Sequence, residues 1–446
     1  MGCCEGIQMK NSKPGDSDSF CEIRAECTDD VPKSRFKPRL GQTLSVRKWN
    51  SAFSEDGHLD MAKVLSRIQR GGVHPSIRGV VWEFLLACYD PDSTFEERNQ
   101  LRQRRREQYG KLKTECQKME LTIGSGKYIT MPIISEDGQP IPDPSNNSDD
   151  SEHNGAIAAI TLNASPKLEE SVTEASPEKE VIQWKLGLHQ IGLDVIRTDR
   201  ALVFYESEAN LAKLWDILAV YAWVDKDIGY CQAGMSDLCS PMVILLENEA
   251  DAFWCFERLM RRVRGNFKCT KSSIGVQSQL STLAAIVKVV DPKLHRHLED
   301  LDGGQYLFAF RMLMVLFRRE FSVVDAMYLW ELMWAMEYNP NSFAIYEELS
   351  EATNKCITLP KGNDKLLKMY GKFERKKVKI GSEDSLSVFL VASVLEARNK
   401  RLLREAKGLD DVVKILNDIS GNLDAKKACK EALKVHKKYL NKLKKS

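Results

Sequence analysis

Apolar residues recur at helical spacing over most of this chain. Leu211, Leu214, Trp215, Leu218 and Ala222 occupy positions i, i+3, i+4, i+7 and i+11, so they line one face of a helix. Similar patterns succeed one another from residue 181 to about 370, and no strand-type alternation of useful length appears. The pattern therefore predicts a mainly α-helical fold with helices of roughly 8–20 residues.

Several individual helices can be placed. Ser76 is expected to cap a helix that begins near residue 78, and Asp251 to cap a second one. Residues 95–120 are dense in Arg and Glu, which is typical of a helix with a solvated face. Residues 307–317 are apolar on most sides, so we expect a central buried helix there.

Two stretches lack this periodicity. Residues 1–45 are polar and aperiodic, and we expect them to be disordered or loosely attached. Residues 132–180 contain DPSNNSDDSEHN and ASPKLEESVTEASPEKE and no aromatic residue, so they cannot bury enough surface to order themselves. We interpret them as a disordered insert inside a folded domain, because the helical pattern before them makes sense only with the helical pattern after them.

Composition excludes some function classes. The 65 basic and 63 acidic residues give a formal net charge of +2, which makes no electrostatic case for nucleic acid. The 12 cysteines and 7 histidines form no cluster with zinc spacing, so no metal site is predicted. The chain has neither a signal-peptide pattern nor about 18 consecutive apolar residues, so we expect a cytoplasmic protein.

Both ends of the chain suggest peripheral membrane contact. Gly2, Cys3 and Cys4 are candidate acylation sites, although Gly6 stands where the usual pattern has Ser or Thr. An ordinary disordered N-terminus is the alternative. The last predicted helix, residues 425–445, carries nine lysines. This pattern is typical either of a solvated outer helix or of a helix that contacts an anionic membrane surface on the endomembranes or plasma membrane.

No motif of a self-sufficient enzyme is present: the chain has no P-loop, nucleophile elbow, dinucleotide fingerprint or H-E-x-x-H. Three short segments are more informative: RGVVWEFLL at 78–86, QIGLDVIRTDR at 190–200, and DIGYCQAGMSDL at 227–238. Each one alone is typical of a helix end or a tight turn.

Together and in this order the three segments resemble the signatures of the TBC domain family of Rab GTPase-activating proteins. The patterns R-x-x-x-W-x-x-L-L, I-x-x-D-x-x-R and Y-x-Q are matched by Arg78, Trp82, Leu85, Leu86, Ile191, Asp194, Arg197, Tyr230 and Gln232. The resemblance runs from about residue 70 to 360. It implies an all-α, multi-helix TBC-type GTPase-activating domain interrupted by the disordered insert.

The resemblance also suggests domain boundaries. We expect a disordered N-terminal segment at 1–45 and the first part of the TBC domain at 46–131. The insert at 132–180 then separates this part from the main part at 181–370. Further helices with a basic end are expected at 371–446.

By resemblance, two residues would complete the active site of a partner GTPase. Arg197 would be the arginine finger, and Gln232 would take over water positioning from the GTPase's own glutamine. Asp194 would orient the Arg197 guanidinium, and Tyr230 would pack beside it. The remaining motif residues are expected to be architectural: Arg78, Trp82 and Ile191.

One departure from the family pattern bears on activity. The family usually reads G-Y-x-Q-G-M, whereas here Ala233 is inserted between Gln232 and Gly234. An extra residue rotates the downstream residues by about 100° if the segment is helical. Two hypotheses therefore remain. The chain is either an active activator of a GTP-bound Rab-type GTPase, with no cofactor of its own, or a catalytically weak TBC-like scaffold that binds a GTPase or a membrane.

Overall fold

The computed structural model describes residues 19–128, 131, 134–135, 177–232, 234–270, 273–350, 367–380, 384–419 and 421–444. Its α-helices are α1 Val46–Asn50, α2 Met61–Gly71, α3 Arg78–Leu85, α4 Phe95–Met119, α5 Pro177–Val195, α6 Glu208–Val224, α7 Met235–Leu245, α8 Glu249–Phe267, α9 Gln277–Val290, α10 Pro292–Asp300, α11 Phe310–Met314, α12 Val323–Met336, α13 Ser342–Ser350, α15 Lys372–Ile380, α16 Leu386–Glu405, α17 Leu409–Asn417 and α18 Ala425–Leu443. The 3-10 helices are η1 Ser19–Cys21, η2 Ala25–Cys27, η3 Pro75–Ile77, η5 Val203–Glu206 and η6 Leu307–Ala309. Within the described residues, the strands are β1 Cys269–Thr270 and β2 Ser273–Ile274, an antiparallel pair. The predicted all-α fold is confirmed.

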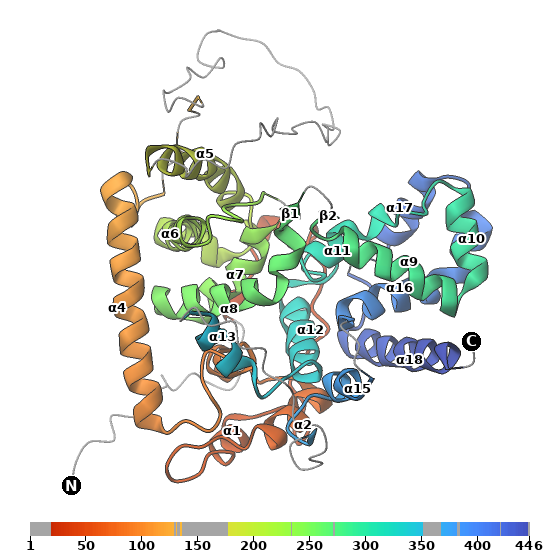
Figure 1. The fold of residues 1–446 in the computed structure, drawn as a ribbon, viewed down its shortest axis with the longest axis horizontal. Coiled ribbons are helices and arrows are strands. Elements are labelled where there is room, and N and C mark those ends of the chain that lie inside the picture. Colours follow the sequence, from red (N-terminus) through yellow and green to blue (C-terminus); the bar gives the residue numbers. More distant parts are fainter. Residues whose placement is uncertain are drawn as a thin grey trace.

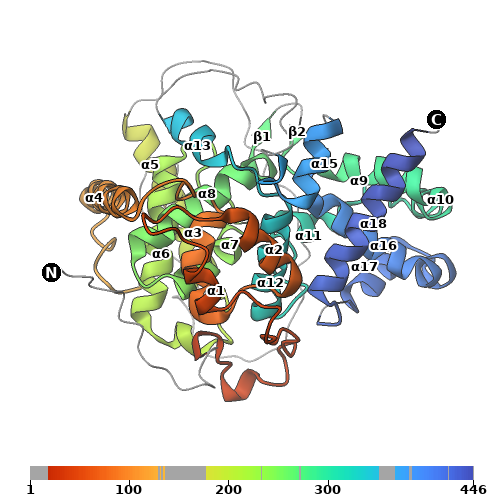
Figure 2. The same ribbon diagram turned by 90° about the horizontal axis from the view of Figure 1, so that it is seen from below.

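Helix α12 lies at the centre of the molecule. Figures 1 and 2 show it between one group of helices that contains α4 to α8 and another that contains α9, α10 and α16 to α18. It packs against α2 and α3 on one side and against α15 and α18 on the other. Its residues 324–336 are all buried, and apart from Asp325 and Glu331 they are apolar or aromatic, as expected for a central helix.

The central helix is not the one predicted. Residues 307–317 form η6 and α11, and then a turn in which Leu316 and Phe317 adopt φ values of 48° and 60°. The Leu316 carbonyl accepts a hydrogen bond from Trp330 Nε1 at 2.8 Å, so the turn is fixed to α12. Apolar composition alone cannot distinguish this buried turn from a continuous helix.

Two predicted helix caps are also wrong. The α8 cap is Asn248, whose side chain accepts from the Ala250 amide at 3.0 Å, and Asp251 instead binds Arg106. The helix near residue 78 comes after η3, which His74 caps in place of Ser76. In both cases the sequence offers two polar residues within three positions, and either can accept from the free amides of the first turn.

Part of the N-terminal segment is folded, so the prediction of disorder at 1–45 is wrong for residues 20–45. The amides of Arg35 and Phe36 donate to the Asp325 carboxylate at 2.8 and 2.7 Å, and the Phe36 ring is buried. A single aromatic anchor and main-chain hydrogen bonds leave no periodic pattern in a sequence. Gly2, Cys3 and Cys4 lie outside the described residues.

The insert lies mostly outside the described residues as well. Helix α5 begins at Pro177, four residues before the predicted boundary at 181, with Glu178 and Glu180 in its first turn. Proline at the first position and acidic residues in the first turn both favour a helix start, so the polar composition of these residues was misleading. Among the described residues, no helix is long and apolar enough to span a bilayer.

The C-terminal helices enclose a buried histidine that should make stability depend on pH. The His436 ring lies 4.7 Å from the Phe373 ring and 4.6 Å from the Phe389 ring, and burial lowers its pKa from 6.5 to about 4. The unfolded chain therefore binds a proton below pH 6.5 that the folded chain does not bind until about pH 4. Stability should fall as pH drops through this window.

The measurement compares the thermal unfolding of the parent with that of a His436→Leu variant at pH 7 and pH 5. The parent should lose more of its midpoint temperature than the variant, because Leu cannot take up a proton. Equal losses in the two proteins would contradict this role of His436.

Candidate functional site

The second signature segment lies where helix α5 ends. The amides of Arg197 and Thr198 donate to the Asp194 carbonyl at 3.2 and 3.0 Å, and Thr198 Oγ1 donates to it at 2.7 Å. The chain therefore keeps a defined turn just after the helix. The Arg197 side chain is 55% exposed, whereas that of Asp194 is 2% exposed. The turn thus presents a solvent-accessible guanidinium next to a buried carboxylate.

Asp194 joins the second signature segment to the third. Its Oδ1 accepts a hydrogen bond from Arg197 Nη2, and its Oδ2 accepts one from Tyr230 Oη at 2.6 Å. Burial raises the pKa of Asp194, although both hydrogen bonds oppose this shift. Burial and the nearby carboxylate also raise the pKa of Tyr230 well above its usual value, so its hydroxyl remains a donor. The arrangement fixes the guanidinium relative to the turn that carries Tyr230.

The third segment forms the turn between α6 and α7. Gly229 adopts φ 60°, a left-handed conformation that glycine accommodates without strain. Tyr230 points from this turn to Asp194, and Gln232 is exposed two residues later. Ala233 lies outside the described residues. The turn therefore places an exposed amide close in sequence to the residue that contacts Asp194.

Gly234 fixes the chain where α7 begins. Its φ is 120°, and a Cβ atom at this position would lie 2.1 Å from Cγ1 of Val315. No residue with a side chain fits without displacement of the turn before α12. The first turns of α7 then bury three apolar residues, Met235, Leu238 and Met242. The helix after the insertion thus keeps its apolar face in the core.

Two arginines near this site were not foreseen from the sequence. The buried Arg318 forms an ion pair with Asp199, which also accepts from Ser240 Oγ at 2.6 Å. Arg319 binds Asp237 of α7 at 2.7 Å, and its side chain is 48% exposed. Burial acts to lower the pKa of Arg319, but the hydrogen bond with Asp237 raises it above its usual value. An Arg-Arg pair after an apolar run gives no signal for either contact.

Comparisons with known proteins decide the family. Residues 146–348 match the family model for the Rab-GTPase-TBC domain. The chain is 28% identical to Rab GTPase-activating protein 22 of Arabidopsis thaliana, over 90% of this chain and 81% of that protein. It is 30% identical to TBC1 domain family member 17 of Homo sapiens, over 68% of this chain and 38% of that protein.

The chain belongs to the TBC family of Rab GTPase-activating proteins. The fold agrees: the crystal structure of the Ypt/Rab-GAP domain of Gyp1p superposes with a TM-score of 0.54 at 17% identity, over 87% of this chain and 96% of that one. The chain spans about four fifths of the plant relative, but only 38% of the human one. The family match begins at residue 146, so it leaves out the first signature segment.

The residues of the first segment lie in the core of this TBC protein. Arg78 Nε donates to Glu331 Oε1 at 2.5 Å, and Trp82 Nε1 donates to the same oxygen at 3.2 Å. Arg78 is 2% exposed and Glu331 is completely buried. Ile191, one turn before Asp194 on α5, is also completely buried. These contacts tie α3 to the central helix α12, whereas the Arg197 side chain is 55% exposed.

Metal binding has no support in the described part of the chain. No group of three or more His, Cys, Asp or Glu side chains is arranged there to hold an ion.

Proposed function

We propose that this protein accelerates GTP hydrolysis by a Rab-type small GTPase, with Arg197 and Gln232 completing the partner's active site. The observation that carries the proposal is the contact of Asp194 with both Arg197 and Tyr230. It places an exposed guanidinium beside the turn that contains Gln232. The names of the relatives support the partner class, since one is a Rab GTPase-activating protein.

The mechanism rests on the groups that a small GTPase lacks. The active site of a small GTPase stabilises the charge on the transferring phosphoryl group poorly, and an arginine supplied in trans by a partner stabilises that charge. Arg197 suits this role because its guanidinium is always charged and offers a fixed fork of donors to phosphate oxygens. Gln232 can donate to one group and accept from another, so it can orient the attacking water. GTP and magnesium belong to the partner.

Asp194 acts as a positioning residue. Its carboxylate holds one nitrogen of Arg197, and the 55% exposure of that side chain leaves other donors facing solvent. A buried carboxylate bound to a guanidinium restricts the rotamers of a long side chain. This restriction lowers the entropy that the arginine loses when it reaches a phosphate.

A single-turnover assay tests the proposal. A panel of purified Rab GTPases is loaded with GTP and mixed with the protein, and release of phosphate is measured over time. At least one GTPase should hydrolyse GTP much faster with the protein than without it. No acceleration of any GTPase that binds the protein would support the alternative, a TBC-like scaffold.

Ala233 offers a test of the glutamine. If the extra residue displaces Gln232, deletion of Ala233 should raise the stimulated rate. Gln232→Ala should then cost more in the deletion variant than in the parent, because losing a positioned hydrogen-bonding group costs up to about 10²–10³ in rate and only the deletion variant would hold Gln232 in position. The four rates form a double-mutant cycle. A coupling near zero would mean that Ala233 does not disturb Gln232.

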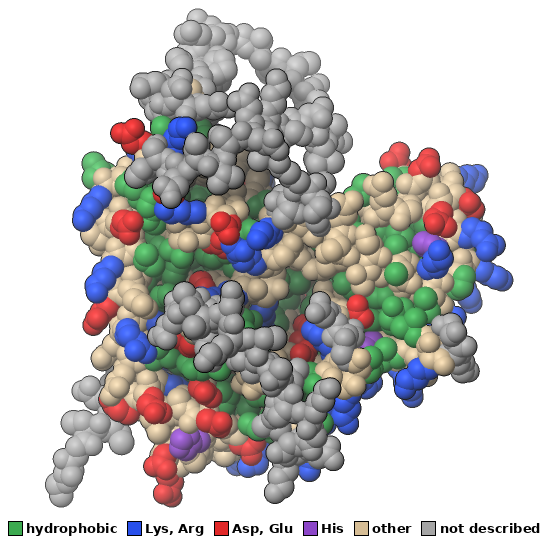
Figure 3. All heavy atoms as spheres, viewed as in Figure 1, with side chains coloured by type: hydrophobic (Ala, Val, Ile, Leu, Met, Phe, Trp, Pro, Cys, Tyr) green, Lys and Arg blue, Asp and Glu red, His purple; other side chains and the backbone are tan. Residues whose placement is uncertain are grey.

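The charge distribution supports peripheral membrane contact as a second function. Residues 371–446 carry 20 Lys and Arg but only 10 Asp and Glu, whereas the rest of the chain carries more acidic than basic residues. Figure 3 shows Lys and Arg along the margin formed by α15 and α18. One surface of α18 is lined by Lys434, Lys437, Lys438, Asn441 and Lys442. We propose that this basic surface contacts anionic lipid from the cytoplasmic side.

The contact should be electrostatic, because the apolar face of α18 is already buried against the fold. Vesicles of phosphatidylcholine with phosphatidylserine should bind the protein, and vesicles of phosphatidylcholine alone should not. Each lysine near such a surface contributes about 1 kcal/mol, so Lys434→Glu with Lys437→Glu should remove most of the binding. Equal binding of parent and variant, or binding that does not weaken with salt, would contradict the proposal.

A further inference from the structure

A short N-terminal segment is hydrogen-bonded to the loop that comes after Arg197. We call residues 20–27 the strap and residues 196–203 the finger loop. The Arg24 amide donates to the Ala201 carbonyl at 2.8 Å, and the Val203 amide donates to the Glu22 carbonyl at 2.8 Å. These bonds flank an antiparallel bridge between Ile23 and Leu202. The strap thus pairs with the finger loop as one strand pairs with another.

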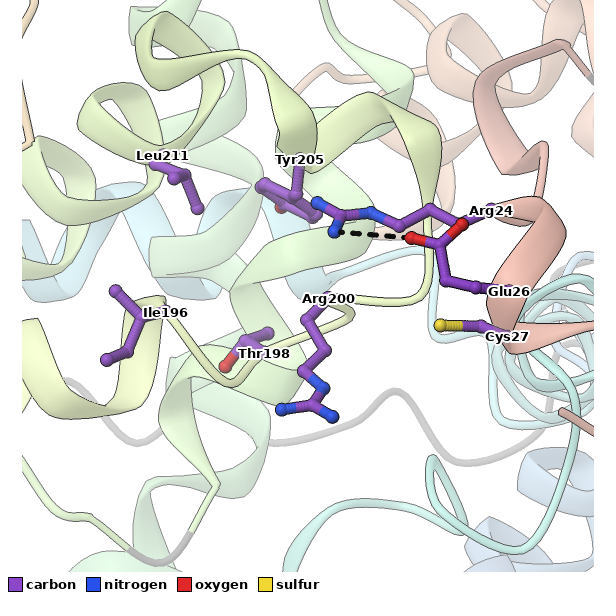
Figure 4. A pocket seen from close by; sticks show the side chains of 8 residues that line it. All are labelled: Arg24, Glu26, Cys27, Ile196, Thr198, Arg200, Tyr205 and Leu211. Atoms are coloured by element: carbon purple, nitrogen blue, oxygen red, sulfur yellow. Dashed lines mark ion pairs between the residues drawn. The ribbon is translucent and has the colours of Figure 1, made fainter. Parts of the chain in front are cut away.

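Side chains reinforce this pairing. Arg24 Nε lies 3.3 Å from Oε1 of Glu206, just beyond the far end of the finger loop. Leu202 is 1% exposed, so the loop is anchored in the core at the bridge. Figure 4 shows Arg24, Glu26 and Cys27 of the strap facing Thr198 and Arg200 across a pocket of about 330 Å³.

The finger loop has little regular structure of its own. Asp199 adopts φ 48° and is held by Arg318 and Ser240, while Asp194 holds the loop at its start. The strap supplies the attachment at the other end, four to six residues after Arg197. A loop held at several points keeps its conformation at a lower entropic cost than one held only at its start.

We propose that the strap is a positioning element for Arg197. This inference rests on the proposed function, because Arg197 has to be positioned only if it acts on a GTPase. The strap lies more than a hundred residues before the region matched by the family model, residues 146–348. The catalytic machinery of this chain therefore extends beyond that region. Loss of the strap lets the finger loop move, and a displacement of about 1 Å can cost roughly 10²-fold in rate.

Two pairs of variants test this proposal. Deletion of residues 2–27 removes the strap, and deletion of residues 2–18 is the matched control that keeps it. Arg24→Pro removes the amide donor at a position whose φ of −54° suits proline, whereas Arg24→Ala keeps the donor and removes the ion pair. The strap deletion and Arg24→Pro should lower the maximal stimulated rate by about ten- to a hundredfold. Arg24→Ala should lower it less than about fivefold, and the control deletion should leave it unchanged.

Two further measurements separate positioning from a general structural role. In an Arg197→Ala background the strap deletion should cause no additional loss of rate, since there is no finger left to position. The dissociation constant for the GTPase should change less than about threefold, because a positioning element acts on the rate rather than on docking. The proposal would be overturned if the strap deletion lowers the rate further in the Arg197→Ala background. It would also be overturned if the strap deletion changes only the dissociation constant and not the rate.

Hydrogen exchange gives a readout that does not depend on GTPase activity. In the free protein, amides of residues 196–203 should exchange faster after the strap deletion and after Arg24→Pro, while amides of α12 should not change. Unchanged exchange in the finger loop would overturn the proposal even if the parent is an active GTPase activator. If exchange in the finger loop becomes faster in these variants but the parent activates no GTPase, the result instead counts against the proposed function.

Discussion

Replacing Arg197 with alanine should remove nearly all stimulation of GTP hydrolysis, a loss of about 10³–10⁵ in rate. The guanidinium is exposed and already bound on one side by a buried carboxylate, so its removal takes away the charge that a partner would meet. The measurement is the single-turnover rate at saturating protein, with the GTPase that responds best to the parent.

Lysine at the same position should rescue little of this loss. A lysine keeps the positive charge, but it lacks the planar fork that can bind two oxygens at once. Both variants should still fold, because the side chain is 55% exposed, although Arg197→Ala removes one of the two partners described for the buried Asp194 carboxylate and should cost some stability. Stimulation near the parent level in Arg197→Ala, with a normal unfolding transition, would refute the assignment of the finger.

Replacing Arg78 with alanine should destabilise the fold by about 3–5 kcal/mol, because it leaves the Glu331 carboxylate buried without its counter-charge. Arg78 and Glu331 are 2% and 0% exposed, so water cannot take the place of the guanidinium without rearrangement. Glu331 also accepts from the Val73 amide at 3.1 Å and from Trp82, so both helix α3 and the chain at Val73 depend on this carboxylate. Chemical denaturation gives the free energy of unfolding.

A paired variant shows whether the charge or the packing matters. Arg78→Met combined with Glu331→Gln keeps a side chain of similar length and an acceptor for Trp82, but removes both charges. This double variant should recover most of the stability lost in Arg78→Ala, since neutral replacements of a buried ion pair are often tolerated. If it is as unstable as Arg78→Ala, the loss comes from packing and not from an unpaired charge.

The sequence predicted the helical fold because most of its helices bury one apolar face, and periodicity reports that face directly. It failed at residues 307–317, where a turn is as apolar as a helix, and α12 occupies the centre instead. Periodicity also gave no sign of the strap, whose contacts with residues 201–203 are made by the main chain. Main-chain hydrogen bonds use groups that nearly every residue has, so no side-chain pattern marks them.

The contacts of the site divide in the same way into those that the sequence predicts and those that only the folded chain shows. Asp194 could be expected to contact Arg197, since residues three apart on a helical turn are neighbours. The contact of Tyr230 with the second oxygen of that carboxylate joins segments 36 residues apart, and only the folded chain shows it. Arg319 and Asp237 are 82 residues apart, and neither is one of the pattern residues of the signature segments. Long-range polar pairs of this kind depend on how the helices pack.

The ion pair between Arg197 and Asp194 has a consequence for the choice of partner. To reach a nucleotide, the guanidinium must share or leave a carboxylate that the fold keeps close to it. A single carboxylate on the partner's surface would attract the guanidinium no more strongly than the Asp194 carboxylate already does. The terminal phosphate of GTP carries more charge and more acceptor oxygens than a carboxylate. The carboxylate thus works as an internal competitor, and we expect the finger to engage a phosphate group in preference to a carboxylate on the partner's surface.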